Sequence, residues 1–135
     1  MANIDLSGNT IINGSGPPGS TANNTGLAGL VIGSAGVITA LNAGTQATSP
    51  LVAFRQTAVN SAAAAAGVRL PPAQPGAEIL IQNLGSGANT ITVFGSVGDS
   101  INVAGTVTAG STGVVQAISS CTIYSCFQAN LWVAK

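Results

Sequence analysis

The sequence predicts an all-β fold, a small antiparallel sandwich or barrel of jelly-roll type with an extended N-terminal arm. Apolar runs of about four to seven residues alternate with turn-forming residues every eight to twelve residues or so, as in small sandwiches and barrels. A chain of 135 residues and 13.0 kDa suits one domain and is too short for two cores. Leu, Ile, Val and Phe make up about a quarter of the residues, enough for a thin core.

Residues 1–26 are predicted to form the arm, and residues 27–135 the β domain. The arm is rich in glycine and asparagine, and its turn formers are interrupted by only four large apolar residues, Ile4, Leu6, Ile11 and Ile12. Such a segment cannot bury its own backbone, so it is either a mobile tail or is ordered on a neighbouring chain. In the second case these four residues are the candidate interface.

The first part of the β domain is expected to hold short strands and loops. Two strands with a tight connection are predicted within residues 27–41, and a loop from Ala43 to Pro50. Residues 51–60 are predicted to form one strand with Val52, Phe54 and Ala58 on one face. The alanine run 62–66 has high helix propensity but is stopped by Gly67 and two prolines, so irregular or edge structure is expected there.

The organisation is clearest after residue 67. Glu78 to Asn83 is predicted to be a strand with Ile79 and Ile81 on one face, and the turn at 85–87 is predicted to make a hairpin with the strand Thr90 to Phe94. The other extended segments and turns are expected as follows: extended 68–72, turn 73–76, turn 95–99, small strands 101–103 and around 107, strand 114–118, strand 121–127 and strand 130–133.

The composition argues against most charged partners and against catalysis. Three basic and three acidic residues give a net charge of zero, so the chain has no basic surface for nucleic acid. Histidine, the commonest general base, is absent. The N-terminus lacks the basic region of a signal peptide, and no apolar run is long enough for a membrane span, so we expect synthesis in a cytosol and no membrane partner. More than half of the residues are Gly, Ala, Ser, Thr or Asn, and a neutral chain of this kind is expected to be a subunit sheltered by neighbours.

The cysteines do not suggest a metal or cofactor site. Cys121 and Cys126 are the only two, too few for a structural zinc without histidine. In one straight strand they would lie about 16 Å apart on opposite faces, beyond the reach of a disulfide, so two free thiols are expected. A tight turn at Tyr124 and Ser125 would be the exception.

Three other kinds of functional site are conceivable from the sequence, and each has a simpler structural interpretation. The glycine loops at 85–87 and 95–98 lack the lysine and the helix of a phosphate loop, so hairpin turns are favoured. Glu78 and Asp99 are the one candidate carboxylate pair for glycoside hydrolysis, but a surface ion pair of Glu78 with Arg69 and an Asx-type turn cap at Asp99 are favoured. The few aromatics are expected to fill gaps between sheets, with a sugar-binding platform as the alternative.

Several motifs together carry a resemblance over about two thirds of the chain. They are Gly67-Val68-Arg69-Leu70-Pro71, Pro75-Gly76-Ala77-Glu78, Gln82-Asn83-Leu84-Gly85, Ile91-Thr92-Val93-Phe94, Gly98-Asp99-Ser100-Ile101-Asn102 and Asn130-Leu131-Trp132. This succession resembles small β-structured virion proteins of tailed bacteriophages, with head decoration or cement proteins nearest and tail-fibre or spike-associated β domains close behind.

The resemblance implies a structural role rather than an enzymatic one. It implies a protein on the outside of a capsid, made in the host cytoplasm, that binds the major capsid protein and itself as a homotrimer or homodimer. The expected mechanism is oligomerisation through apolar, threonine-rich sheet faces while the arm reaches adjacent subunits and stabilises the shell. A tail-fibre or spike-associated module for host attachment is the alternative, although the chain shows no repeats or heptads.

Overall fold

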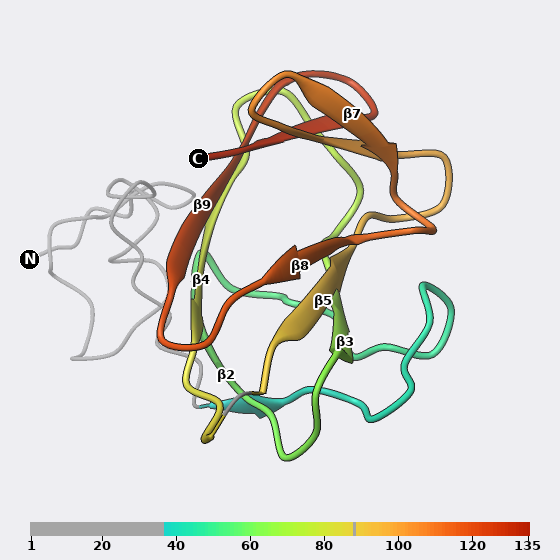
Figure 1. Cartoon of the computed structure of the whole chain (residues 1–135). Coiled ribbons are helices and arrows are strands. Elements are labelled where there is room, and N and C mark those ends of the chain that lie inside the picture. Colours follow the sequence, from blue (N-terminus) through green and yellow to red (C-terminus); the bar gives the residue numbers. More distant parts are fainter. Residues whose placement is uncertain (1–36, 88) are drawn as a thin grey trace, which may run out of the picture. The chain divides into compact units, whose positions relative to one another are not determined.

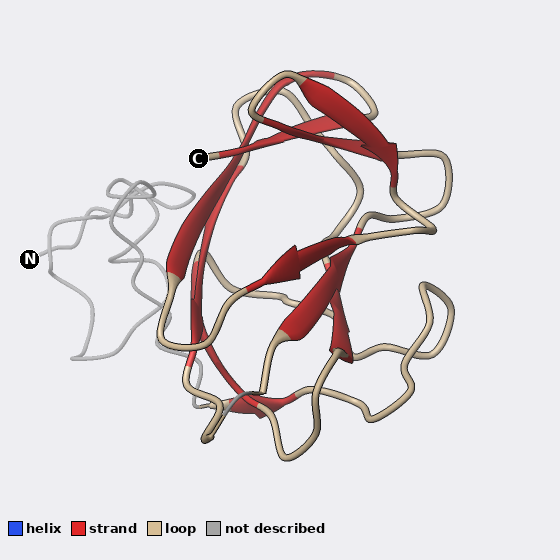
Figure 2. Ribbon diagram, in the orientation of Figure 1, coloured by secondary structure: helices blue, strands red, loops and turns tan. Residues whose placement is uncertain are grey.

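The computed structural model describes residues 37–87 and 89–135, and all regular structure in these ranges is β (Figures 1 and 2). The described strands form two sheets, one of seven strands and one of three. In chain order the strands are β1 (Ile38–Thr39), β2 (Gln56–Asn60), β3 (Ala66–Arg69), β4 (Glu78–Asn83), β5 (Ile91–Phe94), β6 (Ser100–Val103), β7 (Thr106–Ala109), β8 (Val114–Gln116), β9 (Cys121–Gln128) and β10 (Leu131–Ala134).

Both sheets are mixed, so the prediction of a purely antiparallel fold is wrong. The large sheet has the order β1-β2-β4-β9-β10-β6-β7, and the small one the order β3-β5-β8. The pairs β1/β2, β2/β4, β10/β6 and β3/β5 are parallel. The reason is the path of the chain, because β3 follows β2 but lies in the other sheet, and the chain then returns to place β4 beside β2. A strand that is reached by such a crossover runs parallel to its neighbour.

The core contains side chains from both sheets. Val68, Ile91 and Val93 of the small sheet belong to the same buried cluster as Ile81 and Trp132 of the large sheet. Alternation produces this arrangement in β4, where every second residue is buried, and in β5 as far as Val93; Phe94 at the end of β5 is buried as well. The predicted inward positions Ile79, Ile81, Ile91 and Val93 are therefore confirmed.

The predicted hairpin between β4 and β5 is wrong. Both strands exist close to the predicted bounds, but β5 pairs with β3 and β8, whereas β4 pairs with β2 and β9. The glycine-rich connection after Asn83 carries the chain from one sheet to the other. Turn residues permit a change of direction but do not specify the partner of the following strand.

The strand predicted for residues 51–60 is also shorter and faces differently. The β2 strand begins at Gln56, and Thr57 and Val59 are its buried residues, while Ala58 is half-buried and Phe54 exposed. Val52 is fully buried in a separate extended piece, where Leu51 bridges Arg69. A bend at Phe54 and Arg55 interrupts the alternation, so Val52 and the rest of the segment do not share one face.

Other predicted elements agree with the structure. The elements that appear with small shifts in their bounds are the loop at 43–50, the turns at 73–76 and 95–99, the strands at 114–118, 121–127 and 130–133, and the edge structure after residue 62. The predicted arm, residues 1–26, and the first of the two strands predicted within 27–41 lie outside the described residues. No helix in the described ranges is long and apolar enough to cross a membrane.

Candidate interaction surface

The four residues predicted as an interface, Ile4, Leu6, Ile11 and Ile12, lie outside the part of the chain that the structure describes. The described residues form a different candidate surface. It is the face of the seven-stranded sheet that points away from the core, and we call it the outer face.

The register of the large sheet determines which residues share the outer face. Glu78 of β4 pairs with Ser125 of β9, Ser125 with Val133 of β10, Val133 with Asn102 of β6, and Asn102 with Val107 of β7. The adjacent residues along these strands are buried on the opposite side of the sheet; they are Tyr124, Cys126, Trp132 and Ile101. Because side chains alternate along a strand, the row from Glu78 to Val107 lies on the outer face.

The outer face exposes large apolar side chains. Phe127 is 68% exposed, Val107 59% and Ile123 37%. Ile123 is paired with Leu80 on β4 and lies two residues from Ser125, so it belongs to the same face. An apolar surface of this kind, crossed by few charges, is typical of sites that bind another protein.

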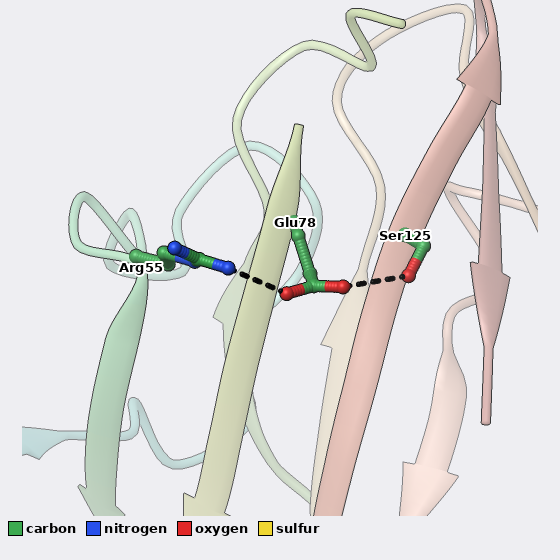
Figure 3. Close-up of polar contacts among 3 residues, drawn as sticks. All are labelled: Arg55, Glu78 and Ser125. Carbon is green, nitrogen blue, oxygen red and sulfur yellow. Dashed lines mark hydrogen bonds and ion pairs between the residues drawn. The ribbon is translucent and has the colours of Figure 1, made fainter. Parts of the chain in front are cut away.

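A charged contact on this face links β4 and β9 to the bend before β2 (Figure 3). The Arg55 guanidinium Nη2 donates to Glu78 Oε1 at 2.9 Å, and the Ser125 hydroxyl donates to Glu78 Oε2 at 3.5 Å. The hydrogen bond from Arg55 lowers the pKa of the Glu78 carboxyl. About half of each charged side chain is exposed, so the pair contributes little to stability.

The predicted partner of Glu78 was wrong. Arg69 lies in the small sheet, and its guanidinium Nη1 donates to the Gln46 carbonyl at 3.2 Å, while Arg55, just before β2, pairs with Glu78. The difference follows from the parallel pairing of β2 with β4, which places Arg55 next to the start of β4. Arg69 and Glu78 lie in different sheets, although they are close along the chain.

A cation and an aromatic ring meet at the C-terminal end of the outer face. Lys135 Nζ lies 5.0 Å from the centroid of the Phe127 ring, within the range of a cation–π contact. The backbone of Lys135 exchanges two hydrogen bonds with Ile123, at 2.9 and 3.1 Å. Lys135 therefore continues the pairing of β10 with β9, and its side chain covers part of the Phe127 ring.

Glu78 and Asp99 occupy different environments. Glu78 is on the outer face, whereas Asp99 is 6% exposed and its Oδ2 accepts the Ala73 backbone N–H at 2.8 Å. Asp99 thus fixes the turn at residues 73–76 in place of the predicted Asx cap on its own turn. Its carboxylate is used for structure, since a buried acceptor needs a donor.

The two cysteines agree with the geometric prediction. Both are free, and both lie in β9, with Cys121 exposed and Cys126 buried. The strand runs straight through Tyr124 and Ser125 without the tight turn that a disulfide would require. Burial raises the pKa of the Cys126 thiol, so Cys126 is the less reactive of the two.

The aromatic residues divide into two groups. Trp132, Tyr124 and Phe94 are buried, as predicted for residues that fill gaps in a thin core. Phe54 and Phe127 are exposed, which contradicts that prediction for them. The sequence does contain a signal that Phe127 is exposed. Phe127 follows Tyr124 by three residues, and an odd number of steps along a strand places two side chains on opposite faces.

Among the described residues no group of three or more Cys, Asp or Glu side chains is placed to hold a metal ion. Comparisons of the chain with protein-family models, curated proteins and solved structures give no match.

Proposed function

We propose that this chain is a structural virion protein, a head decoration or cement protein that binds the outside of a phage capsid and stabilises the shell. The observation that carries the proposal is the apolar outer face, on which Phe127, Val107 and Ile123 are exposed. Leaving these side chains in water is costly, and contact with another protein removes that cost. The resemblance of the turn and strand motifs to phage virion proteins supplies the kind of partner, the major capsid protein.

The composition supports the same role. The chain has no histidine and only six charged residues, and in the described part Glu78 and Asp99 are engaged with Arg55 and the Ala73 amide. A shell protein needs no catalytic group, because many weak contacts repeated across a lattice supply its binding energy. We accordingly propose that the chain is not an enzyme and uses no cofactor or metal.

We further interpret the two sheets as the layers of a small sandwich that carries residues 1–26 as an extended arm. In this proposal the outer face binds the capsid and the chain associates with itself as a dimer or trimer on the virion surface. A contact of about 800 Å² per partner is the usual size of a specific interface. The outer face runs across five strands of the large sheet, from β4 to β7, which gives it the breadth for such a contact.

The location is tested by counting copies in purified virions with quantitative mass spectrometry. Hundreds of copies per particle are expected for a head protein. A handful would instead favour the alternative, a tail-fibre or spike-associated module for host attachment. Absence from the particle would overturn both.

The surface is tested by the substitution Phe127→Lys. Because Phe127 is 68% exposed and loses only the exposed cation–π contact with Lys135, we expect the free energy of unfolding to fall by no more than about 1 kcal/mol. Bound copies per particle should fall at least about tenfold, since a charge would be buried in an apolar contact. Val97→Lys is the matched control, because Val97 is 83% exposed but lies in the turn after β5, away from the outer face. Equal binding of the two variants would exclude the outer face as the capsid contact.

A further inference from the structure

Each sheet ends in a strand whose second edge has no partner among the described residues. The β7 strand is last in the large sheet and pairs only with β6, and β8 is last in the small sheet and pairs only with β5. Figure 1 shows β7 at the top of the view and β8 below it. An edge strand presents free backbone N–H and C=O groups that can pair with another chain.

A groove of about 440 Å³ lies between these two strands. Thr106 and Thr108 of β7 form one wall, Val114 and Val115 of β8 the other, and Tyr124 and Ala134 of the large sheet contribute to the lining as well. Thr108 is paired with the buried Ile101, so the β7 wall belongs to the inner side of the sheet. The groove is thus the part of that inner side which the three-stranded sheet leaves uncovered.

The chemistry of the groove selects an uncharged, extended occupant. None of the residues that line it carries a charge; they are threonine, glutamine, tyrosine and small or branched apolar residues. Neither edge strand has the lysine or proline that protects many edges from pairing. A charged side chain would lose its hydration here without gaining a partner.

The sequence outside the described structure contains a segment with one face of this chemistry. Residues 1–36 carry a single charged side chain, Asp5. Ile4 and Leu6 alternate with Asn3, Asp5 and Ser7, so in a strand the two apolar residues would share one face and the polar ones the other. The thirty residues from 7 to 36 can extend to about 100 Å, which is enough to reach a neighbouring copy.

We propose that the groove between β7 and β8 accepts residues 2–7 of a second copy of this chain as an added strand. The backbone of the added strand pairs with a free edge, and Ile4 and Leu6 enter the groove beside Val114 and Ala134, as in recognition by β-augmentation. The inference rests on the part of the proposed function in which the chain associates with itself, and it does not depend on a location in the virion. It also gives Ile4 and Leu6 a defined binding site.

Cross-linking of the full chain tests the proposal. Both preparations carry Cys121→Ser and keep the buried Cys126. One of them also carries Leu6→Cys, and the other carries Thr106→Cys. The second preparation has an affinity tag, so that the mixed dimer has its own mass. The two are combined and treated with a short bismaleimide. We expect at least tenfold more mixed dimer than from Leu6→Cys combined with tagged Val97→Cys, because Val97 is exposed but does not line the groove.

Two results would overturn the proposal: equal yields with Thr106→Cys and Val97→Cys, or a cross-link that forms only within one chain carrying both Leu6→Cys and Thr106→Cys. The experiment contains only the purified chain. If the groove instead binds only a different virion protein or a small molecule, the yields with Thr106→Cys and Val97→Cys will therefore also be equal. Because no particle is needed, failure here is distinct from failure of the virion role.

Sedimentation provides a second measurement. The double substitution Ile4→Asp with Leu6→Asp should raise the dissociation constant of self-association at least tenfold. The control adds the same charges at the outward positions, Asn3→Asp with Ser7→Asp, and should change it by less than threefold. Equal effects of the two pairs would contradict insertion of Ile4 and Leu6.

Discussion

Asn83 shows how a single polar residue organises the junction between the sheets. Its side chain is fully buried, and its Nδ2 donates to the carbonyls of Asn89 and Ala117 at 3.1 Å, while its Oδ1 accepts the Gly85 N–H at 2.8 Å. These bonds connect the end of β4 to the loop that follows it and to the segment after β8. A buried amide is tolerated only with such partners, so Asn83 determines where the chain leaves the large sheet.

Tyr124 gives the chain a stability that depends on pH. Its side chain is 1% exposed, and burial raises the pKa of the phenol above its ordinary value near 10. The folded state therefore keeps its proton at a pH where the unfolded state releases it. The resulting stability is complete below about pH 10 and is lost as the pH rises above it, by up to about 1.4 kcal/mol per pH unit.

The measurement is urea unfolding between pH 8 and 11, compared with Tyr124→Phe, which cannot ionise. The natural chain should lose stability above about pH 10 more steeply than the variant. Because Tyr124 is the only tyrosine, tyrosinate absorbance reports its titration directly. Parallel curves for the two proteins would show that the buried phenol is not the source.

At the scale of elements, turns determine strand ends more reliably than strand partners. Gly76 and Gly98 have φ values of 91° and 89°, which glycine adopts without strain, and both stand where the sequence predicted a turn. The same kind of signal at 85–87 predicts a hairpin, but there the chain crosses from one sheet to the other. Such a crossing needs residues that are as flexible as those of a hairpin turn. Two-residue turns join β6 to β7, through Ala104 and Gly105, and β9 to β10, through Ala129 and Asn130; only the first of these two turns has positive φ at both residues.

Ala104 is a strained position in that turn, so it can be improved. Its φ is 50°, a conformation that asparagine adopts more readily than alanine, and Asn-Gly is the preferred pair for such a turn. Ala104→Asn should raise the free energy of unfolding by about 0.5–1 kcal/mol.

Thermal and urea unfolding check this prediction. Ala53→Asn is the control, since Ala53 is also exposed but is not among the residues of positive φ. An equal gain at both positions would mean that the turn conformation is not the cause.

At the scale of the molecule, Gln116 ties the small sheet to the large one. It lies on β8 and is 3% exposed; its Nε2 donates to the Ile81 carbonyl of β4 at 2.9 Å, and its Oε1 accepts the Tyr124 hydroxyl of β9 at 3.2 Å. These contacts hold β8 beside one end of the proposed groove. Asn83 of β4 adds a second polar link, because its Nδ2 also donates to the Gln116 carbonyl at 3.4 Å, and the buried apolar cluster contributes non-directional contacts.

Gln116→Leu should lower the free energy of unfolding by about 2–3 kcal/mol, because the buried Tyr124 hydroxyl loses its acceptor. Chemical denaturation measures the loss. Val115→Thr, at the neighbouring residue that is 67% exposed, should change stability by less than about 0.5 kcal/mol. A neutral Gln116→Leu would show that the Gln116 side chain does not stabilise the contact between the sheets.

The amino-acid sequence by itself determined the all-β class, most strand positions and the inward residues of β4 and β5, because alternation and turn residues act over a few neighbours. It also determined the net charge of zero on which the proposed role partly rests. Only the tertiary structure decided the parallel pairings, the partner of Glu78, the exposure of Phe127 and the groove between β7 and β8. These depend on which distant strands become neighbours, and pairing between strands is a property of the whole packed chain.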